Sequence, residues 1–375
     1  MTGKEKCEAA LSGSNMPGTP PIIPIYDKGY IAKLSGGCAR DFITAGQTWR
    51  LEATEHALLR HDVDGIFVNA GTNDDFLNNH ELLDMDGKLN IYRDNVTGER
   101  FALDEDGNKY DHTGAPIQPP ASLGDKIIRT KEDIKRILPS PFTMDSVLSS
   151  GFYSTIGYLS EKYPDRHFAA QIGSPIVYAV GYCGYEEMMS MLLAEPELTH
   201  QVLEHIYEIE YSKIALCKEF GAESVWLTSY FTGTDTISPK CFREFALPYE
   251  RRLAERAHDL GLKVIYWFLN DMRGIIDDIG SLPIDAILPE QPRKGYPVDM
   301  PAIRNAMSRQ RCVMSYTYEN HFITADKDAI RSAYEDQYTV CSGTGAFAAS
   351  TTIMPSDADP SAMDMYCEIV REINM

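Results

Sequence analysis

The sequence predicts a (β/α)8 barrel with a small antiparallel β insert after the second strand. Short segments that are apolar on both faces alternate with amphipathic segments of helical period along most of the chain. This alternation is typical of a parallel sheet covered by helices. Eight such apolar segments in a chain of 375 residues match the size of a barrel. A doubly wound open sheet is the alternative, because a strand count does not prove closure.

The fifth apolar segment shows the pattern most clearly. Residues 264–269 are apolar, and the chain turns polar at Asn270 and Asp271. A periodic helical segment, 239–260, precedes this run, and a second one, 272–279, follows it. A short apolar run between two helices is the pattern of a buried parallel strand, whose carboxyl end faces the ligand in such folds.

The remaining elements follow the same alternation in chain order. The other expected strands are 21–26, 63–71, 168–172, 224–229, 285–290, 312–317 and 347–353. The other expected helices are 5–11, 48–60, 131–138, 145–163, 186–193, 196–220, 301–307, 327–336 and 361–373. We expect these elements to form one domain over residues 1–375.

Residues 72–125 interrupt the alternation. This stretch is polar, and its Asp-Gly and Thr-Gly pairs separate short runs of period two, such as 88–93 and 99–103. Such turns are typical of hairpins, so we expect a β meander inserted after the second strand. A loop without regular structure is the alternative.

Composition excludes several classes of partner. The formal net charge is −20, which disfavours nucleic acids and anionic membranes. Apolar runs are too short to span a bilayer, and the first residues carry no signal-peptide core, so we expect a cytoplasmic protein. The eight cysteines form no C-x-x-C pair, which favours reduced, buried thiols.

The ends of the expected strands collect an aromatic, amide-rich and acidic set of side chains. In a barrel these ends share one rim, where substrates bind. The candidate substrate contacts on this rim are Tyr26, Asn69, Gln171, Tyr230, Trp267, Asn270 and Tyr316. Trp267 and Phe268 alternate across the fifth strand, so one should point into the barrel and the other toward the helices. The Trp267 indole could stack on a planar ligand or belong to the core.

Glu319 and His321 form the pair with the clearest chemical potential. In an extended segment, residues two apart face the same way. A carboxylate and an imidazole on one side could bind a divalent metal such as zinc, with Glu290 as a third ligand, or form an acid–base pair. With Asp271, these two residues are our candidate catalytic groups. A surface glutamate and an unrelated loop histidine are the alternative.

Four stretches resemble the uroporphyrinogen decarboxylase superfamily, which includes corrinoid-dependent methyltransferases. The most specific is 241–249 (CFREFALPY), which leads to 261–265; the others are 4–13 followed by Pro24, 173–175 with a helix after it, and 275–279. The resemblance covers nearly the whole length. It implies a (β/α)8 barrel, and its methyltransferase branch carries a small β insert similar to 72–125.

Functional residues of the superfamily carry over poorly. The decarboxylases hold their substrate with an Arg-rich N-terminal motif, which residues 24–40 lack, and their catalytic aspartate falls near Asn69 or Ala70. Thiol-activating methyltransferases bind zinc through a His-x-Cys and a later Cys. Those positions are Trp267-Phe268-Leu269 and Thr351 or Thr352 here.

By elimination, the resemblance favours the branch that moves a methyl group from a small substrate, such as a methoxylated aromatic, to a corrinoid carried by a partner protein. Cleavage of a methyl ether requires stabilisation of a poor phenoxide leaving group, by a Lewis-acid metal or a general acid. Two alternatives stay open. One is a decarboxylase-like lyase acting on a small acid or tetrapyrrole, and the other is a non-catalytic binding barrel.

Overall fold

The computed structural model describes residues 1–14, 18–68, 74–86, 88–111, 114–117, 127–291 and 295–373. Its main sheet is entirely parallel and runs in the order β12-β11-β10-β9-β8-β7-β2-β1-β13. Its strands are β1 (Ile25–Tyr26), β2 (Gly65–Val68), β7 (His167–Gly173), β8 (Ser224–Ser229), β9 (Lys263–Phe268), β10 (Ala286–Pro289), β11 (Cys312–Met314), β12 (Phe347–Ala348) and β13 (Ile353–Met354).

The sheet closes into a barrel through its last segment. β12 and β13 are two pieces of the stretch 347–354: β12 pairs with β11, and β13 pairs with β1. A further parallel bridge joins Ile22 to Ala349. The predicted (β/α)8 barrel is thus confirmed, and the open doubly wound sheet is excluded.

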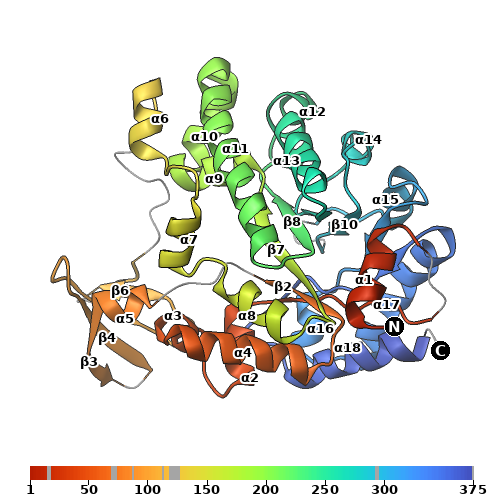
Figure 1. The fold of residues 1–375 in the computed structure, drawn as a ribbon, viewed down its shortest axis with the longest axis horizontal. Helices are drawn as coiled ribbons and strands as arrows, with labels where there is room; N and C mark the ends of the chain where they lie inside the picture. Colours follow the sequence, from red (N-terminus) through yellow and green to blue (C-terminus); the bar gives the residue numbers. More distant parts are fainter. Residues whose placement is uncertain are drawn as a thin grey trace.

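Helices surround the barrel, as Figure 1 shows. They are α1 (Gly3–Leu11), α2 (Lys28–Leu34), α3 (Ala39–Thr44), α4 (Gln47–Arg60), α5 (Asp75–Asn79), α6 (Lys131–Ile137), α7 (Met144–Ser150), α8 (Ser154–Lys162), α9 (Pro175–Cys183), α10 (Tyr185–Ala194), α11 (Pro196–Glu219), α12 (Pro239–Cys241), α13 (Leu247–Asp259), α14 (Ile276–Gly280), α15 (Met300–Ala306), α16 (Glu319–Ile323), α17 (Lys327–Cys341) and α18 (Pro360–Ile373). No helix in the described part of the chain is long and apolar enough to cross a membrane.

The predicted β insert is present. Its four antiparallel strands are β3 (His80–Asp86), β4 (Leu89–Asp94), β5 (Arg100–Leu103) and β6 (Lys109–Asp111), in that order. The insert has its own small cluster of Tyr92, Phe101 and Leu103, with Phe76 packed against it. Figure 1 shows this sheet projecting from the side of the molecule that lies away from both termini.

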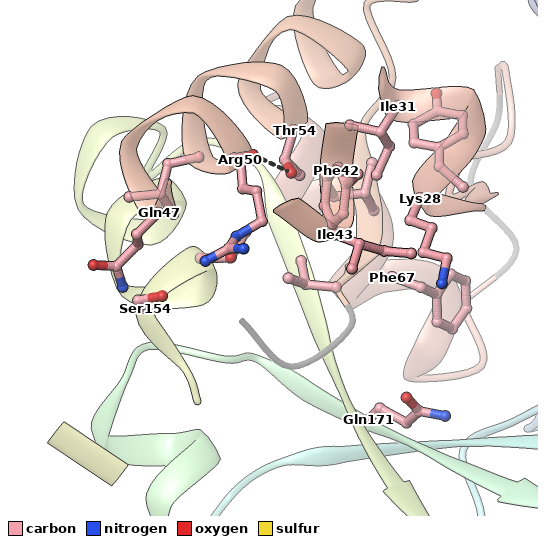
Figure 2. A pocket seen from close by; sticks show the side chains of 15 residues that line it. Lys28, Ile31, Phe42, Ile43, Gln47, Arg50, Thr54, Phe67, Ser154 and Gln171 are labelled. Atoms are coloured by element: carbon pink, nitrogen blue, oxygen red, sulfur yellow. Dashed lines mark hydrogen bonds between the residues drawn. The ribbon is translucent and has the colours of Figure 1, made fainter. Parts of the chain in front are cut away.

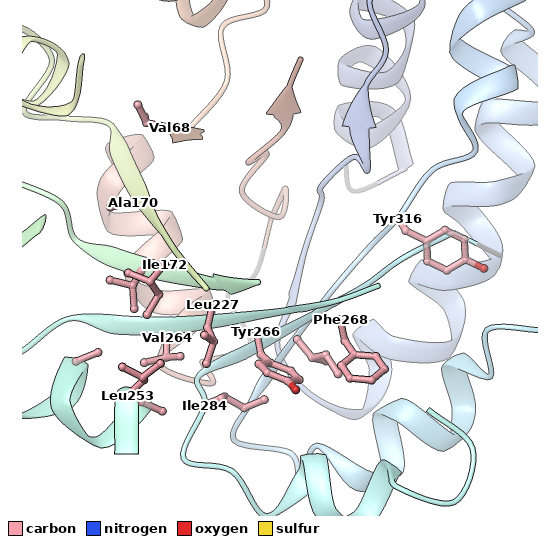
Figure 3. Close-up of a cluster of buried hydrophobic side chains, with 14 of the residues drawn as sticks. Val68, Ala170, Ile172, Leu227, Leu253, Val264, Tyr266, Phe268, Ile284 and Tyr316 are labelled. Atoms are coloured by element: carbon pink, nitrogen blue, oxygen red, sulfur yellow. The ribbon is translucent and has the colours of Figure 1, made fainter. Parts of the chain in front are cut away.

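Side chains of the barrel strands alternate between two apolar layers. On β9, Ile265 and Trp267 belong to the cluster that fills the barrel, whereas Val264, Tyr266 and Phe268 belong to the layer between sheet and helices. Figure 3 shows part of this outer layer. Burying one such large side chain contributes about 1.5–3 kcal/mol, so a register slip on this strand is strongly disfavoured.

The predicted single helix 239–260 is interrupted. Residues Phe242–Ala246 form a π-helical turn between α12 and α13, in which the Leu247 N–H donates to the Phe242 carbonyl, five residues earlier. Pro248 explains the wider turn, because proline has no N–H and its ring would clash with the carbonyl of Glu244 in a regular helix.

Two further predictions of local structure need correction. The segment 145–163 forms two helices, α7 and α8, because Gly151 ends α7 in the left-handed conformation with φ 65°. The segment around Glu319 and His321 is not extended, because both residues lie in the short helix α16. Successive helical residues are 100° apart, so residues two apart are about 200° apart and point to opposite sides.

Candidate functional site

A cavity lies beside the barrel rim, and we call it the amino-terminal cavity. Its volume is about 470 Å³. Helices α2 to α4 form one wall, the ends of β1, β2 and β7 form another, and the start of α8 completes it (Figure 2). The described lining residues are Tyr26, Lys28, Ile31, Phe42, Ile43, Gln47, Arg50, Leu51, Thr54, Ile66, Phe67, Val68, Ser154, Thr155 and Gln171.

Arg50 is the most unusual residue of this cavity. Its side chain is only 6% exposed. The guanidinium Nη1 donates to the Ala45 carbonyl at 2.9 Å, and Nη2 lies 4.0 Å from Asp74 Oδ1. Burial lowers the pKa of Arg50, and Asp74 acts in the opposite direction. A cation held with so little water is stabilised by an anionic neighbour, and Asp74 supplies one here.

The remaining lining is apolar with a few hydrogen-bonding groups. Phe42, Ile43 and Phe67 supply apolar surface, and Lys28 is a second cation. The Ser154 hydroxyl is buried with no hydrogen-bond partner among the described residues. No aspartate or glutamate occurs among the described lining residues, although the chain as a whole carries a net charge of −20.

A second, smaller site lies across the barrel, and we call it the acidic pocket. Its volume is about 90 Å³, and it lies between the ends of β9 and β10 and the helices α14 and α15. Asn270, Asp271 and Glu290, which were expected on the rim from the sequence, come together here. Its described lining residues are Asn270, Asp271, Met272, Arg273, Ile276, Glu290, Tyr296, Pro297, Val298, Asp299, Ala302 and Ile303.

Hydrogen bonds fix the polar end of β9. Asn270 Nδ2 donates to Asp235 Oδ2 at 3.1 Å, and the Asp271 N–H donates to Asp235 Oδ1 at 3.1 Å. The Arg273 guanidinium Nε donates to both Asp271 oxygens, at 2.9 and 2.8 Å. Burial would raise the pKa of Asp271, but the hydrogen bonds from Arg273 outweigh it and hold the pKa below its usual value. Asp271 is therefore a firmly ionised anchor for Arg273.

Two buried carboxylates hold the strand ends from the outside. Glu250 on α13 accepts from the Ser229 and Tyr266 hydroxyls, each at 2.7 Å, and so ties β8 to β9. Glu210 on α11 accepts from the Gly173 N–H at 2.9 Å and pairs with Lys213 at 2.5 Å. Burial raises the pKa of both carboxyls, against the lowering effect of these donors. Both groups position the rim without facing either cavity.

The expected metal site is not assembled in the described part of the chain. No group of three His, Cys, Asp or Glu side chains there could hold a metal ion. The expectation that Glu319 and His321 face the same way is wrong, because both lie in α16. Glu319 donates its N–H to Gln291, next to Glu290, whereas the His321 ring lies against Tyr318 at 5.0 Å. The residues Glu290, Glu319 and His321 do not fit a zinc site, and we derive no step through zinc.

The His321 ring can still form hydrogen bonds to a ligand without a metal. Its Nδ1 is buried with no hydrogen-bond partner among the described residues. Burial lowers the pKa of His321, with Asp326 opposing, so the ring is neutral at pH 7. A neutral imidazole can donate one hydrogen bond and accept another.

The aromatic candidates divide between core and rim. Trp267 is 2% exposed and stacks on Trp226 inside the barrel, with ring centroids 5.2 Å apart, so it is a core residue. Tyr316 belongs to the outer layer, which Figure 3 shows. Tyr230 packs against Phe231, with ring centroids 4.6 Å apart, and is partly exposed near the rim. Trp267 and Tyr316 are not among the described lining residues of the amino-terminal cavity or of the acidic pocket.

Other sequence candidates lie at the amino-terminal cavity. Gln171 lines it from β7, and Tyr26 lines it from β1 while packing against Tyr30 at 5.5 Å. Asn69 lies outside the described residues. Sequence reasoning missed Arg50 and Ser154, because an arginine or a serine on an amphipathic helix is usually solvated. No motif marks either residue, and only the packing of α4 against α8 brings them to one cavity.

A closed (β/α)8 barrel with cavities at the carboxyl ends of its strands is an architecture of enzymes. Residues 118–373 match the family described as "Uroporphyrinogen decarboxylase (URO-D)". The chain therefore belongs to the uroporphyrinogen decarboxylase family. Most residues of the amino-terminal cavity precede the matched stretch.

Two curated relatives are both named uroporphyrinogen decarboxylase. The protein from Chlorobaculum parvum is 25% identical over 274 residues, which are 69% of this chain and 75% of the relative. The protein from Gloeobacter violaceus is 24% identical over 197 residues, which are 48% of this chain and 53% of the relative.

Among solved structures, a methyltransferase from Methanosarcina mazei is similar along 100% of both chains, with a TM-score of 0.68 and 13% identity. This likeness shows a shared fold.

Proposed function

We propose that this protein transfers a methyl group from a small methylated substrate, such as a methoxylated aromatic, to a corrinoid carried by a partner protein. The observation that supports this most is the amino-terminal cavity. It is mainly apolar, it has the size of a small-molecule site, and it lies beside the barrel rim. The full-length similarity in fold to a methyltransferase agrees with the proposal.

The same cavity argues against a porphyrinogen substrate. Uroporphyrinogen carries carboxylates around its whole edge, and each needs a cation or several hydrogen-bond donors when it is bound. The described lining offers Lys28 and Arg50 as its cations. Arg40 is engaged elsewhere, since its Nη1 donates to the Lys88 carbonyl at 2.8 Å.

The reaction needs a route for one methyl group and one proton. The bond between the methyl carbon and the ether oxygen breaks, the methyl group passes to the corrinoid cobalt, and the leaving oxygen takes up a proton. We assign hydrogen bonding at that oxygen to His321, whose neutral ring can donate, with Glu319 as a further candidate on the same rim. Asp271, the third residue expected from the sequence, is ionised and accepts from Arg273, so its part is to hold Arg273 in place. The open rim is where the partner protein would bring its corrinoid close to the methyl carbon.

Formation of methylcobalamin tests this proposal. Purified protein is mixed with reduced cob(I)alamin and a panel of methoxy-aromatics, methylamines and betaines, and absorbance follows methylation of cobalt. We expect turnover with at least one panel member and none without protein. No spectral change across the panel would reject methyl transfer.

The names of the curated relatives favour a second candidate, a decarboxylase. It predicts release of carbon dioxide from uroporphyrinogen in the absence of any corrinoid. We expect no release. A non-catalytic barrel predicts that neither assay responds.

A further inference from the structure

We propose that Lys28 is the catalytic acid of the methyl transfer: its ammonium group donates a hydrogen bond, and then a proton, to the leaving oxygen of the substrate. This inference rests on the proposed function and names the group that supplies the proton. It is carried by the place of Lys28 in the amino-terminal cavity, by the lack of a described partner for its ammonium group and by the division of the cavity wall.

Lys28 lies at the carboxyl end of a barrel strand, where the catalytic groups of such folds are found. It is the first residue of α2, which follows β1 in the chain. Asp27 fixes the backbone at this point, because its Oδ1 accepts from the Gly29 N–H at 2.7 Å and from the Ser356 hydroxyl at 2.6 Å. The Lys28 side chain thus starts from a firmly held position and lines the cavity (Figure 2).

The Lys28 ammonium has donors left for a ligand. No described residue accepts a hydrogen bond from it or forms an ion pair with it, and the described cavity wall contains no carboxylate. Arg50 is different, because the Ala45 carbonyl and Asp74 already engage its guanidinium. Lys28 is also exposed, so it can regain a proton from solvent after each turnover. Its three N–H groups are therefore available to an oxygen of a bound substrate.

The cavity wall has an apolar middle and two polar ends. In Figure 2, Ser154 lies on one side of Ile43, and Lys28 lies on the other, with Gln171 at the Lys28 end. This end is next to the barrel, because Gln171 belongs to β7, whose residue Ala169 faces the barrel interior. A ring packed in the apolar middle would place one substituent at the Lys28 end. A methoxy group there lies beside the open rim, where the partner protein is proposed to bring the methyl acceptor.

The acid strength of an ammonium group suits this leaving group. When the carbon–oxygen bond breaks, both of its electrons stay on the oxygen, because the electron pair for the new bond to the methyl carbon comes from the methyl acceptor, the reduced corrinoid. The oxygen takes one proton from the Lys28 ammonium, and the resulting amine takes one from water. In water, alkylammonium ions and phenols are acids of nearly equal strength, so this transfer costs little free energy. A neutral imidazole such as that of His321 can donate a hydrogen bond but gives up its proton far less readily.

Substitution of Lys28, measured with two leaving groups, tests the inference. The substrates are 4-methylanisole and 4-nitroanisole, which are both neutral and similar in size, and absorbance follows methylation of cob(I)alamin. The 4-nitrophenolate ion is stable enough to leave without a proton, whereas 4-methylphenolate needs one. Lys28→Met should slow the reaction of 4-methylanisole on the order of a hundredfold and that of 4-nitroanisole by less than about threefold.

Two further variants separate proton transfer from charge and from general effects. Lys28→Arg keeps the positive charge and the hydrogen bond but cannot release its proton, so it should recover only part of the loss with 4-methylanisole. Lys135→Met on α6 is the matched control, because Lys135 is exposed and is not among the described lining residues, and we expect unchanged rates.

Equal slowing of both substrates by Lys28→Met would mean that Lys28 acts on folding or binding, and it would overturn the inference. An unchanged rate with 4-methylanisole would do the same. If Lys28→Met does not fold by circular dichroism, Lys28→Arg decides the matter through the same comparison of the two substrates.

Failure of this inference and failure of the proposed function are distinguishable. Methylcobalamin formation by the native protein that Lys28→Met leaves unchanged would reject the inference and uphold methyl transfer. No methylcobalamin from any substrate with the native protein would reject both.

Discussion

The amino-terminal cavity and the acidic pocket lie on opposite parts of one rim and use charge in opposite ways. The first buries the guanidinium of Arg50 in a wall whose described residues include no carboxylate. The second gathers Asp271, Glu290 and Asp299, and its cation Arg273 is 69% exposed on its side chain. A net charge of −20 thus says little about any one site. The charge that a ligand meets depends on which residues the fold brings together and how far it removes them from water.

The ion pairs that hold the two regions in place also differ in how far they are removed from water. The β7 strand, which carries Gln171 into the amino-terminal cavity, is held at its end by the buried pair Glu210–Lys213, with side-chain exposures of 1% and 7%. At the acidic pocket, the corresponding ion pair of Asp271 and Arg273 is open to solvent on the arginine side. Buried pairs are costly to break, and exposed pairs are screened.

The largest effect should come from Lys213→Met. It leaves Glu210 buried without its cation, and we expect a loss of about 3–5 kcal/mol in the free energy of unfolding. Burial raises the pKa of Glu210 even though Lys213 acts in the opposite direction. The protonated carboxyl therefore stabilises the folded state at low pH, and this stabilisation is lost as the pH rises through the folded-state pKa. Urea unfolding should show a larger loss at about pH 8 than at about pH 5.

Lys4→Met is the control for that measurement. Lys4 pairs with Glu223 at 2.8 Å, and its side chain is 35% exposed, so we expect a change below about 1 kcal/mol. Equal losses for the two variants would show that burial does not decide the strength of these pairs.

An intermediate effect is expected from Gln171→Glu. This variant adds a carboxylate to the wall of the amino-terminal cavity, and it should slow methylcobalamin formation from an anionic methoxybenzoate by about tenfold through like-charge repulsion. The rate with neutral methoxybenzene should stay the same. Gln171→Met, which keeps the shape of the side chain without a charge, is the control in the same assay. A similar loss in both variants would point to shape instead of charge.

The smallest effect on stability is expected from Arg273→Gln. Without the guanidinium, burial should dominate and raise the pKa of Asp271, which NMR titration of the carboxyl carbon can follow. In the native protein the lowered pKa of Asp271 contributes stability above its unfolded-state value, and this contribution is lost as pH falls through the folded-state value. A loss of stability as large as that of Lys213→Met would contradict the contrast between the two regions.

Much of the fold could be predicted from the local sequence pattern. Residues 264–269 were expected as a strand with one aromatic side chain inward and one outward, and β9 confirms this with Trp267 inside and Phe268 outside. The insert after the second strand was also confirmed. These two predictions are correct because alternation and turn chemistry are properties of residues that lie next to one another in the chain.

Local pattern failed where a short segment could adopt either conformation. Glu319 and His321 gave no periodicity to separate strand from helix, and the chain forms α16 there, which turns the two side chains apart. The segment 239–260 was expected as one helix from its periodicity, and that pattern did not reveal the π-helical turn that Phe242–Ala246 forms before Pro248.

By itself, then, the sequence determined the barrel, its insert and the polar rim residues Asn270, Asp271 and Glu290, because each of these follows from residues next to one another in the chain. Only the tertiary structure decided that Arg50 of α4, Ser154 of α8 and Gln171 of β7 line one cavity. Burial and electrostatic isolation depend on packing between segments far apart in the chain, and no local pattern encodes them.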